Sequence, residues 1–304
     1  MSEKLRIFGA EFIYINSKTA QDMPLNRPDI FKRRNAFPTI ADVVMLVVMF
    51  FVGSFTLGVV IKSAWTSLSA GLDDVTYSRM VRYGSSMFGA LIAMLFYRYA
   101  RGVRGGVLRY QLKWFNGWLI LVGLIGIAAI GIVEEPLWPL LPEWDMEQAI
   151  GVGTWAIINS VVLAPVLEEI IFRGVILETV RSRWGKMWGV VVSSLLFGAV
   201  HGIPQQIINA CLVGMLLGGV YIATDSLLAV IILHAINNAI SYILMTTLQT
   251  EVITLRSMID SDMIYWGVYA ASCAVALFCT SIIATAARER KRPKSNKTTP
   301  TIVE

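Results

Sequence analysis

The chain is a series of long apolar runs separated by short polar segments. Several runs reach the roughly twenty residues that a helix needs to cross a bilayer, and the alternating pattern of a lipid-facing β-barrel is absent. We therefore predict an all-α polytopic membrane helix bundle with about eight transmembrane helices. The predicted spans are residues 40–61, 80–97, 117–133, 152–176, 187–202, 207–223, 226–247 and 263–286.

The polar segments between these spans alternate in charge. Segments 98–116 and 177–186 and the tail from Arg288 are rich in Lys and Arg. Segment 134–150 is acidic with neither Lys nor Arg, and segment 248–262 is net acidic. Loops rich in Lys and Arg stay on the cytoplasmic side of a membrane. With eight spans, the alternation predicts that the N- and C-termini are both cytoplasmic.

Composition narrows the class of protein further. Hydrophobic residues make up 56% of the 304 residues and charged residues 15%, with a mean hydropathy of +0.63, whereas about a quarter of the residues in soluble domains are charged. The net charge of +5 gathers beside the spans, so we predict the lipid bilayer as a partner and no nucleic acid. The three cysteines (Cys211, Cys273 and Cys279) lack CxxC spacing and are predicted to be packing residues. The first 38 residues lack an apolar core with a cleavage site, so no signal peptide is predicted.

Three charged residues interrupt the fourth apolar run. Glu168, Glu169 and Arg173 lie among Ile, Leu, Val, Phe and Ala, where each central charge costs roughly 2.5–3.5 kcal/mol on insertion scales. On a helix Glu169 and Arg173 are four positions apart and share a face, while Glu168 is turned away by about 100°. We predict that Arg173 pairs with Glu169 and leaves Glu168 free for chemistry.

Both histidines of the chain, His201 and His234, also lie in predicted spans, and Asn238 shares a helix face with His234. At 1.5 Å per residue, counted from the cytoplasmic end of each span, Glu168, His201 and Asn238 lie roughly 20 Å deep and His234 roughly 14 Å deep. The hydrocarbon core is about 30 Å thick. We therefore expect the four side chains to meet in one cavity near mid-membrane.

A carboxylate, two imidazoles and an amide suit activation of water for attack on a carbonyl carbon. The carboxylate takes the proton of the water, and imidazole and amide donors stabilise the oxyanion. Two histidines and a glutamate are also a ligand set of catalytic zinc. The residues are compatible with either scheme, so zinc (Glu168, His201 and His234 as candidate ligands) and a metal-independent site both stay open. The chain has no HExxH motif, no GxGD pair in a span and no GxSx serine with a matching histidine.

The motifs Glu168-Glu169-x-x-x-Arg173, Phe197-x-x-x-His201 and His234-x-x-x-Asn238 occur in this order on separate predicted spans. Their order and spacing, with Phe172-Arg173-Gly174, resemble the CAAX prenyl protease and bacteriocin-processing family, also called CPBP or Abi, over about residues 120–245.

The resemblance implies an eight-helix intramembrane endopeptidase, a hydrolase of the glutamate or metallo type. In that family the position of Glu168 activates water. The positions of His201, His234 and Asn238 line the cavity and support the oxyanion or, in another view, a metal. Glu169, Arg173 and Phe197 would hold the site in shape.

On this basis the chain divides into a cytoplasmic N-terminal segment (1–38), N-terminal transmembrane helices (39–118), a catalytic core (119–248), a last loop and helix (249–287) and a basic tail (288–304). The predicted location is multi-pass in a membrane, the inner cell membrane if the source is bacterial. The expected substrate is a membrane-associated peptide or protein, either a C-terminal CAAX-type tail or a leader peptide. The sequence assigns neither the substrate nor the oligomeric state.

Two other functions stay open on the sequence. One is a non-catalytic immunity or scaffolding protein built on the same bundle, although binding alone does not require this set of polar residues. The other is a proton-coupled transporter that uses Glu168 and the histidines as a relay. The chain lacks the internal repeat that transporter halves often show.

Overall fold

The computed structural model describes residues 4–7, 10–13, 37–68, 75–103, 117–142, 151–248 and 254–290. The chain divides into two compact units, Met1–Phe37 and Pro38–Glu304. The first unit contains an antiparallel hairpin of β1 (Lys4–Ile7) and β2 (Ala10–Ile13), with Leu5 opposite Phe12. The hairpin was not predicted. Segments 104–116 and 143–150 and the tail after Arg290, whose charges support the predicted topology, lie outside the described residues.

The described residues of the second unit are helical apart from their turns. The long helices are α2 (Ile40–Leu68), α3 (Val75–Ala100), α4 (Trp118–Glu134), α10 (Pro204–Thr224), α11 (Leu227–Leu248) and α13 (Asp262–Glu289). With α4 extended by the 3-10 helix η1 (Glu135–Leu140), these six segments are long and apolar enough to cross a membrane. A short helix, α12 (Leu255–Met258), precedes α13. This confirms the predicted all-α, multi-pass membrane bundle.

The two remaining predicted spans are helical but irregular. Residues 152–176 correspond to a continuous series of α6 (Thr154–Ile157), η2 (Ile158–Leu163), α7 (Ala164–Glu169), η3 (Ile170–Leu177) and α8 (Glu178–Trp184), in which η2 and η3 are π-helical. Residues 187–202 correspond to α9 (Lys186–Ala199). A helix of 14 residues is about 21 Å long, so α9 alone does not cross a hydrocarbon core of about 30 Å.

His201 therefore lies beyond the end of α9, not inside a helix as the predicted span 187–202 required. The reason is local. Pro204 begins α10, and the residue before a proline avoids the helical region because the proline ring clashes with it. Ile203 accordingly has an extended backbone, with φ −103° and ψ 125°.

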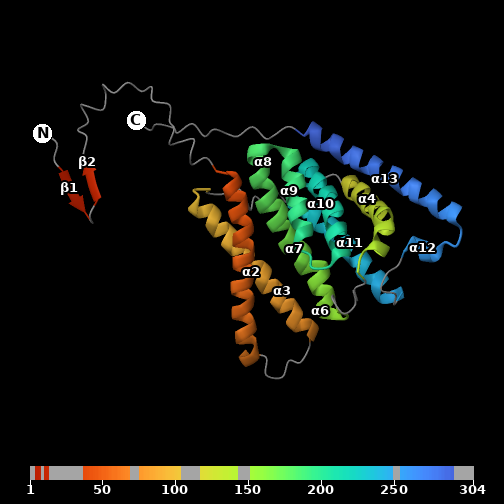
Figure 1. The fold of residues 1–304 in the computed structure, drawn as a ribbon, viewed down its shortest axis with the longest axis horizontal. Helices are drawn as coiled ribbons and strands as arrows, with labels where there is room; N and C mark the ends of the chain where they lie inside the picture. The colour runs from red at the N-terminus through yellow and green to blue at the C-terminus, as the bar shows by residue number, and fades with distance from the viewer. Residues whose placement is uncertain are drawn as a thin grey trace. The chain divides into compact units, whose positions relative to one another are not determined.

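Two hydrophobic cores hold the second unit together. Figure 1 shows the course of the helices that contribute to them. One lies among α4, α10, α11 and α13 and is centred on Leu217, Val220 and Leu233. The other joins α2 and α3 to η3 and contains Met94 and Ile171. Since η3 directly follows Glu168 and Glu169 in the chain, the charged segment sits where the two cores meet.

Side-chain bonds gather several helix ends on one side of the bundle. Arg101 pairs with Asp42 at 2.7 Å, which joins the end of α3 to the beginning of α2. Arg183 donates to the carbonyl of Pro38 at 2.9 Å, and Lys186 donates to the carbonyl of Ala287 at 2.6 Å. The beginning of α2 and the end of α13 therefore lie on the same side of the bundle.

Cysteine labelling tests which side is cytoplasmic. In a background without the three native cysteines, Leu140→Cys and Glu289→Cys place single thiols at exposed positions near opposite ends of the bundle. The positive-inside rule predicts that a membrane-impermeant maleimide applied to intact cells labels Leu140→Cys alone. Labelling of both positions from outside the cell would contradict the predicted topology.

Candidate active site

The segment that carries the two adjacent glutamates is shaped by Pro165. In the π-helical η2 the N–H of Ala164 bonds to the carbonyl of Asn159, five residues earlier. The same register would pair the carbonyl of Ser160 with the N–H of residue 165, which proline lacks. Asn238 of α11 fills this vacancy, because its Nδ2 donates to the Ser160 carbonyl at 2.9 Å. Such π-helical turns occur frequently at functional sites.

Glu169 is the centre of a fully buried polar cluster. Its Oε1 accepts from Arg173 Nη1 at 2.9 Å and from His234 Nδ1 at 2.9 Å, and both Glu169 and Arg173 have no exposed surface. The predicted pair of Glu169 and Arg173 is therefore present. Arg173 Nη2 also donates to the carbonyl of Gly214 at 3.1 Å. A Cβ at Gly214 would lie only 3.2 Å from Phe197 Cδ1, so the glycine lets α10 approach α9 and the guanidinium closely.

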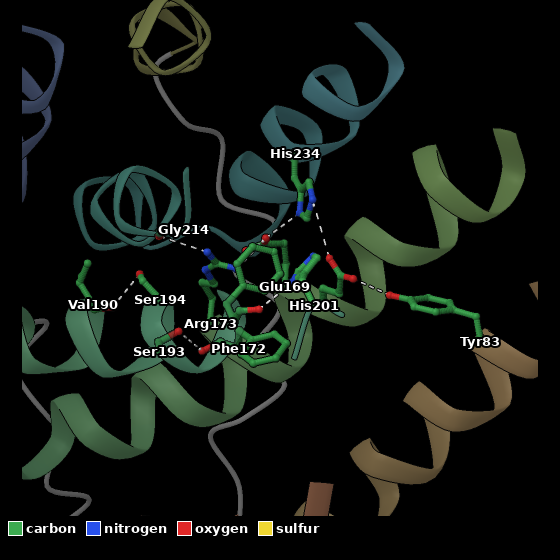
Figure 2. Close-up of polar contacts among 12 residues, drawn as sticks. Tyr83, Glu169, Phe172, Arg173, Val190, Ser193, Ser194, His201, Gly214 and His234 are labelled. Carbon is green, nitrogen blue, oxygen red and sulfur yellow. Dashed lines mark hydrogen bonds and ion pairs between the residues drawn. The ribbon is translucent and has the colours of Figure 1, made fainter. Parts of the chain in front are cut away.

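Glu168 points away from this cluster, as its position on the helix predicts. Its Oε1 accepts from the hydroxyl of Tyr83 on α3 at 2.5 Å, and its Oε2 faces His234 Nε2 at 3.8 Å (Figure 2). The residue is buried, with 7% of its surface exposed. His234 thus spans the two glutamates, with Nδ1 on Glu169 and Nε2 toward Glu168. Sequence reasoning missed Tyr83, since nothing in the spacing of α3 residues marks this position.

The ring of Phe197 packs against both imidazole rings and against the guanidinium of Arg173. The rings of His201 and His234 lie edge-on to it, with centroids 5.0 and 5.8 Å from its own. The Arg173 guanidinium carbon lies 4.6 Å from the ring centroid. His201 Nδ1 contacts the carbonyl oxygen of Phe197 at 2.8 Å. Because a carbonyl only accepts, Nδ1 carries a proton and Nε2 is the atom of His201 left for a ligand.

The structure thus brings Glu168, Glu169, Arg173 and His234 into one chain of contacts, with Phe197 linking His201 to it. Asn238 takes a different place from the one expected. Its recorded partners among the described residues are the Ser160 carbonyl and the side chain of Asn237, not the two glutamates. A primary amide has two N–H donors, so one donor of Asn238 is still available beyond the bond to Ser160.

Comparison with known proteins covers the same segment. Residues 150–240 match the family described as type II CAAX prenyl endopeptidase, Rce1-like. This match confirms the resemblance that the three motifs indicated. The chain is also similar to an uncharacterised 24.3 kDa protein of Escherichia coli, with 29% identity over 125 residues. That alignment covers 38% of this chain and 58% of the Escherichia coli protein. No solved structure matches the chain.

At family level, the Rce1-like match supports an intramembrane protease of the CAAX type. The matched segment runs from the turn before α6 into α11 and contains Glu168, His201, His234 and Asn238. Tyr83 lies outside it. The Rce1-like segment therefore receives one contact to its central carboxylate from a helix that the match does not cover.

The candidate zinc ligands in this Rce1-like segment do not converge. No three His, Cys, Asp or Glu side chains of the described ranges lie close enough together to hold a metal ion. The Nδ1 atoms of His201 and His234 bond to the Phe197 carbonyl and to Glu169, so Nε2 of each ring is the nitrogen that would bind a metal. The arrangement does not fit a three-ligand zinc site, and zinc binding stays a prediction for metal analysis.

Proposed function

We propose that the protein is an intramembrane endopeptidase in which Glu168 activates water for hydrolysis of a peptide bond in a membrane-associated substrate. The gap between Glu168 Oε2 and His234 Nε2 carries this proposal. At 3.8 Å it is too long for a direct hydrogen bond, and in this proposal one water molecule bonds to both atoms from the open side of the gap. A water there would contact a carboxylate on one side and an imidazole on the other.

The surrounding residues suit the chemistry that follows. Glu168 takes a proton from the water, the hydroxide adds to the substrate carbonyl carbon, and Glu168 then returns the proton to the departing amine. The oxyanion of the tetrahedral intermediate needs hydrogen-bond donors. We assign this role to Nε2 of His201 or His234 in its protonated form and to the second N–H of Asn238.

We infer that water reaches such a site beside the turn between α9 and α10. The turn between α9 and α10 follows a helix of only about 21 Å and includes His201. Non-helical backbone at membrane depth is tolerated where it is buried in protein or lines a water-filled cavity. A turn of this kind beside the polar cluster supports hydrolysis over a role that requires no water.

The substrate is tested by comparing membranes that contain the wild-type protein or the Glu168→Ala variant. Quantitative proteomics of protein N- and C-termini should show termini that depend on Glu168. Loss of C-terminal tripeptides from Cys-containing tails would assign a CAAX-type substrate, and new N-termini after a leader would assign leader processing. Identical termini in both membranes, at equal protein levels, would refute the endopeptidase proposal.

Tyr83→Phe tests how the carboxylate is positioned. The change keeps the ring and removes a 2.5 Å hydrogen bond to Glu168. Bonds to charged groups contribute about 1.5–3 kcal/mol, so we expect kcat to fall about 10- to 100-fold with little change in KM. Tyr97→Phe is the matched control, because its hydroxyl on the same helix bonds to Asp42, away from the site. Equal kcat values for the two variants would remove Tyr83 from the mechanism.

A further inference from the structure

A groove between α2 and α3 lies apart from the candidate active site. It encloses about 190 Å³, and its α2 side runs from Ser54 and Phe55 to Lys62 while its α3 side holds Arg82 and Ser86. We call it the α2–α3 groove. Gly58 forms its floor, where any side chain would collide with the hydroxyl of Ser86. The groove is therefore narrow at Gly58, mostly apolar in its lining and open along its length.

The two ends of the α2–α3 groove differ in chemistry. Lys62 and Arg82, both exposed, stand at one end. Toward the other end, Phe55 has 73% of its surface exposed. The Ser54 hydroxyl, which is buried at the Phe55 end, has no hydrogen-bond partner among the described residues. The end with Lys62 and Arg82 thus attracts an anion, and the end with Phe55 suits an apolar chain.

The cationic end falls at a membrane boundary. Lys62 lies 22 positions after Ile40, about 33 Å along α2, and Arg82 lies 18 positions before Ala100, about 27 Å along α3. The hydrocarbon core is about 30 Å thick. Both side chains therefore reach the interface opposite the end where Asp42 and Arg101 pair, at the depth of lipid headgroups.

We propose that the α2–α3 groove binds one anionic phospholipid, with its phosphate between Lys62 and Arg82 and an acyl chain along Phe55. Within the described ranges no carboxylate pairs with Lys62 or Arg82, so their charges are available to a phosphate. Basic side chains at a membrane surface attract anionic lipids. The Ser86 hydroxyl, one helical turn from Arg82 and beside Gly58, supplies a donor for the phosphate or ester oxygens. The proposal does not depend on proteolysis.

Native mass spectrometry of the purified full chain tests this proposal. Phosphatidylglycerol and phosphatidylcholine with the same acyl chains are added separately, and the lipid retained per protein is measured. We expect the wild type to retain one phosphatidylglycerol in preference to phosphatidylcholine. Lys62→Gln/Arg82→Gln should weaken phosphatidylglycerol binding about 30-fold, and either single change about fivefold. Binding of phosphatidylcholine should not change.

Three controls separate the α2–α3 groove from general charge effects. Arg256→Gln/Arg288→Gln removes the same charge elsewhere and should bind phosphatidylglycerol as the wild type does. Lys62→Arg/Arg82→Lys keeps the charge and should keep the lipid. Glycerol 3-phosphate should not displace the lipid; full displacement would indicate a site for soluble phosphates and overturn the proposal. The proposal would also be overturned if the wild type retained both lipids equally. Unchanged phosphatidylglycerol binding in the single variants would overturn it as well, and this result does not depend on whether the double variant folds.

Discussion

Replacing Glu168 with glutamine is expected to abolish cleavage while the protein stays folded and still binds its substrate. Glutamine has nearly the same size and can still accept from Tyr83 through its carbonyl oxygen, so the contacts of this buried side chain survive. Its amide cannot take a proton from water. General-base catalysis contributes roughly 10²–10⁴ in rate, so kcat should fall by at least that factor while KM changes little.

Glu178→Gln is the matched control for this experiment. Glu178 lies on the same continuous helical stretch, and its carboxylate pairs with Arg181 near the basic end of the bundle. Its loss should leave kcat unchanged. The readout is the rate of peptide release by purified protein in lipid, with thermal stability measured in parallel. A Glu168→Gln protein that cleaves at the wild-type rate would remove Glu168 as the base.

The same variant separates the competing functions and the two hydrolytic schemes. A Glu168→Gln protein that retains its effect in cells without cleavage would favour an immunity or scaffolding role. A metal scheme requires zinc in the purified wild type, its loss in His201→Ala and His234→Ala, and reversible inhibition by a chelator. The metal-independent scheme requires full activity in protein that metal analysis shows to be free of zinc.

The parts of the site that could be predicted are those encoded by spacing within one helix. The pair of Glu169 and Arg173 follows from a separation of four residues, and the divergence of Glu168 from its neighbour follows from the helical turn angle. Both are present. The reason is that backbone geometry alone fixes which side chains share a helix face.

The parts that could not be predicted depend on contacts between distant segments. Tyr83 and Glu168 are 85 residues apart, and Asn238 and Ser160 are 78 apart, so no local pattern links them. The π-helical turns beside Pro165 shift the helix register, which a regular periodicity does not show. The end of α9 before His201 could have been anticipated from Pro204, since a proline commonly marks a helix boundary.

Arg173→Ala is expected to lower the amount of folded protein in membranes as well as its activity. Arg173 is fully buried and joins three elements: it pairs with Glu169, donates to Gly214 of α10 and lies over the Phe197 ring of α9. Removing it leaves the Glu169 carboxylate in low dielectric without its cation. Breaking a buried pair in this way typically costs about 3–5 kcal/mol, and total stabilities are commonly about 5–15 kcal/mol.

Arg181→Ala provides the comparison, because Arg181 pairs with Glu178 where both side chains are partly exposed. Exposed pairs contribute about 0–1 kcal/mol, so this variant should accumulate and melt almost like the wild type. Arg173→Lys should recover only part of the loss, since a single ammonium cannot reproduce the forked contacts to Glu169 and Gly214 or the stacking on Phe197. Membrane abundance and thermal unfolding in detergent measure both effects. Equal membrane abundance and equal thermal stability of Arg173→Ala and Arg181→Ala would mean that water reaches the Glu169 cluster. The packing around Phe197, and not this ion pair, would then hold the site together.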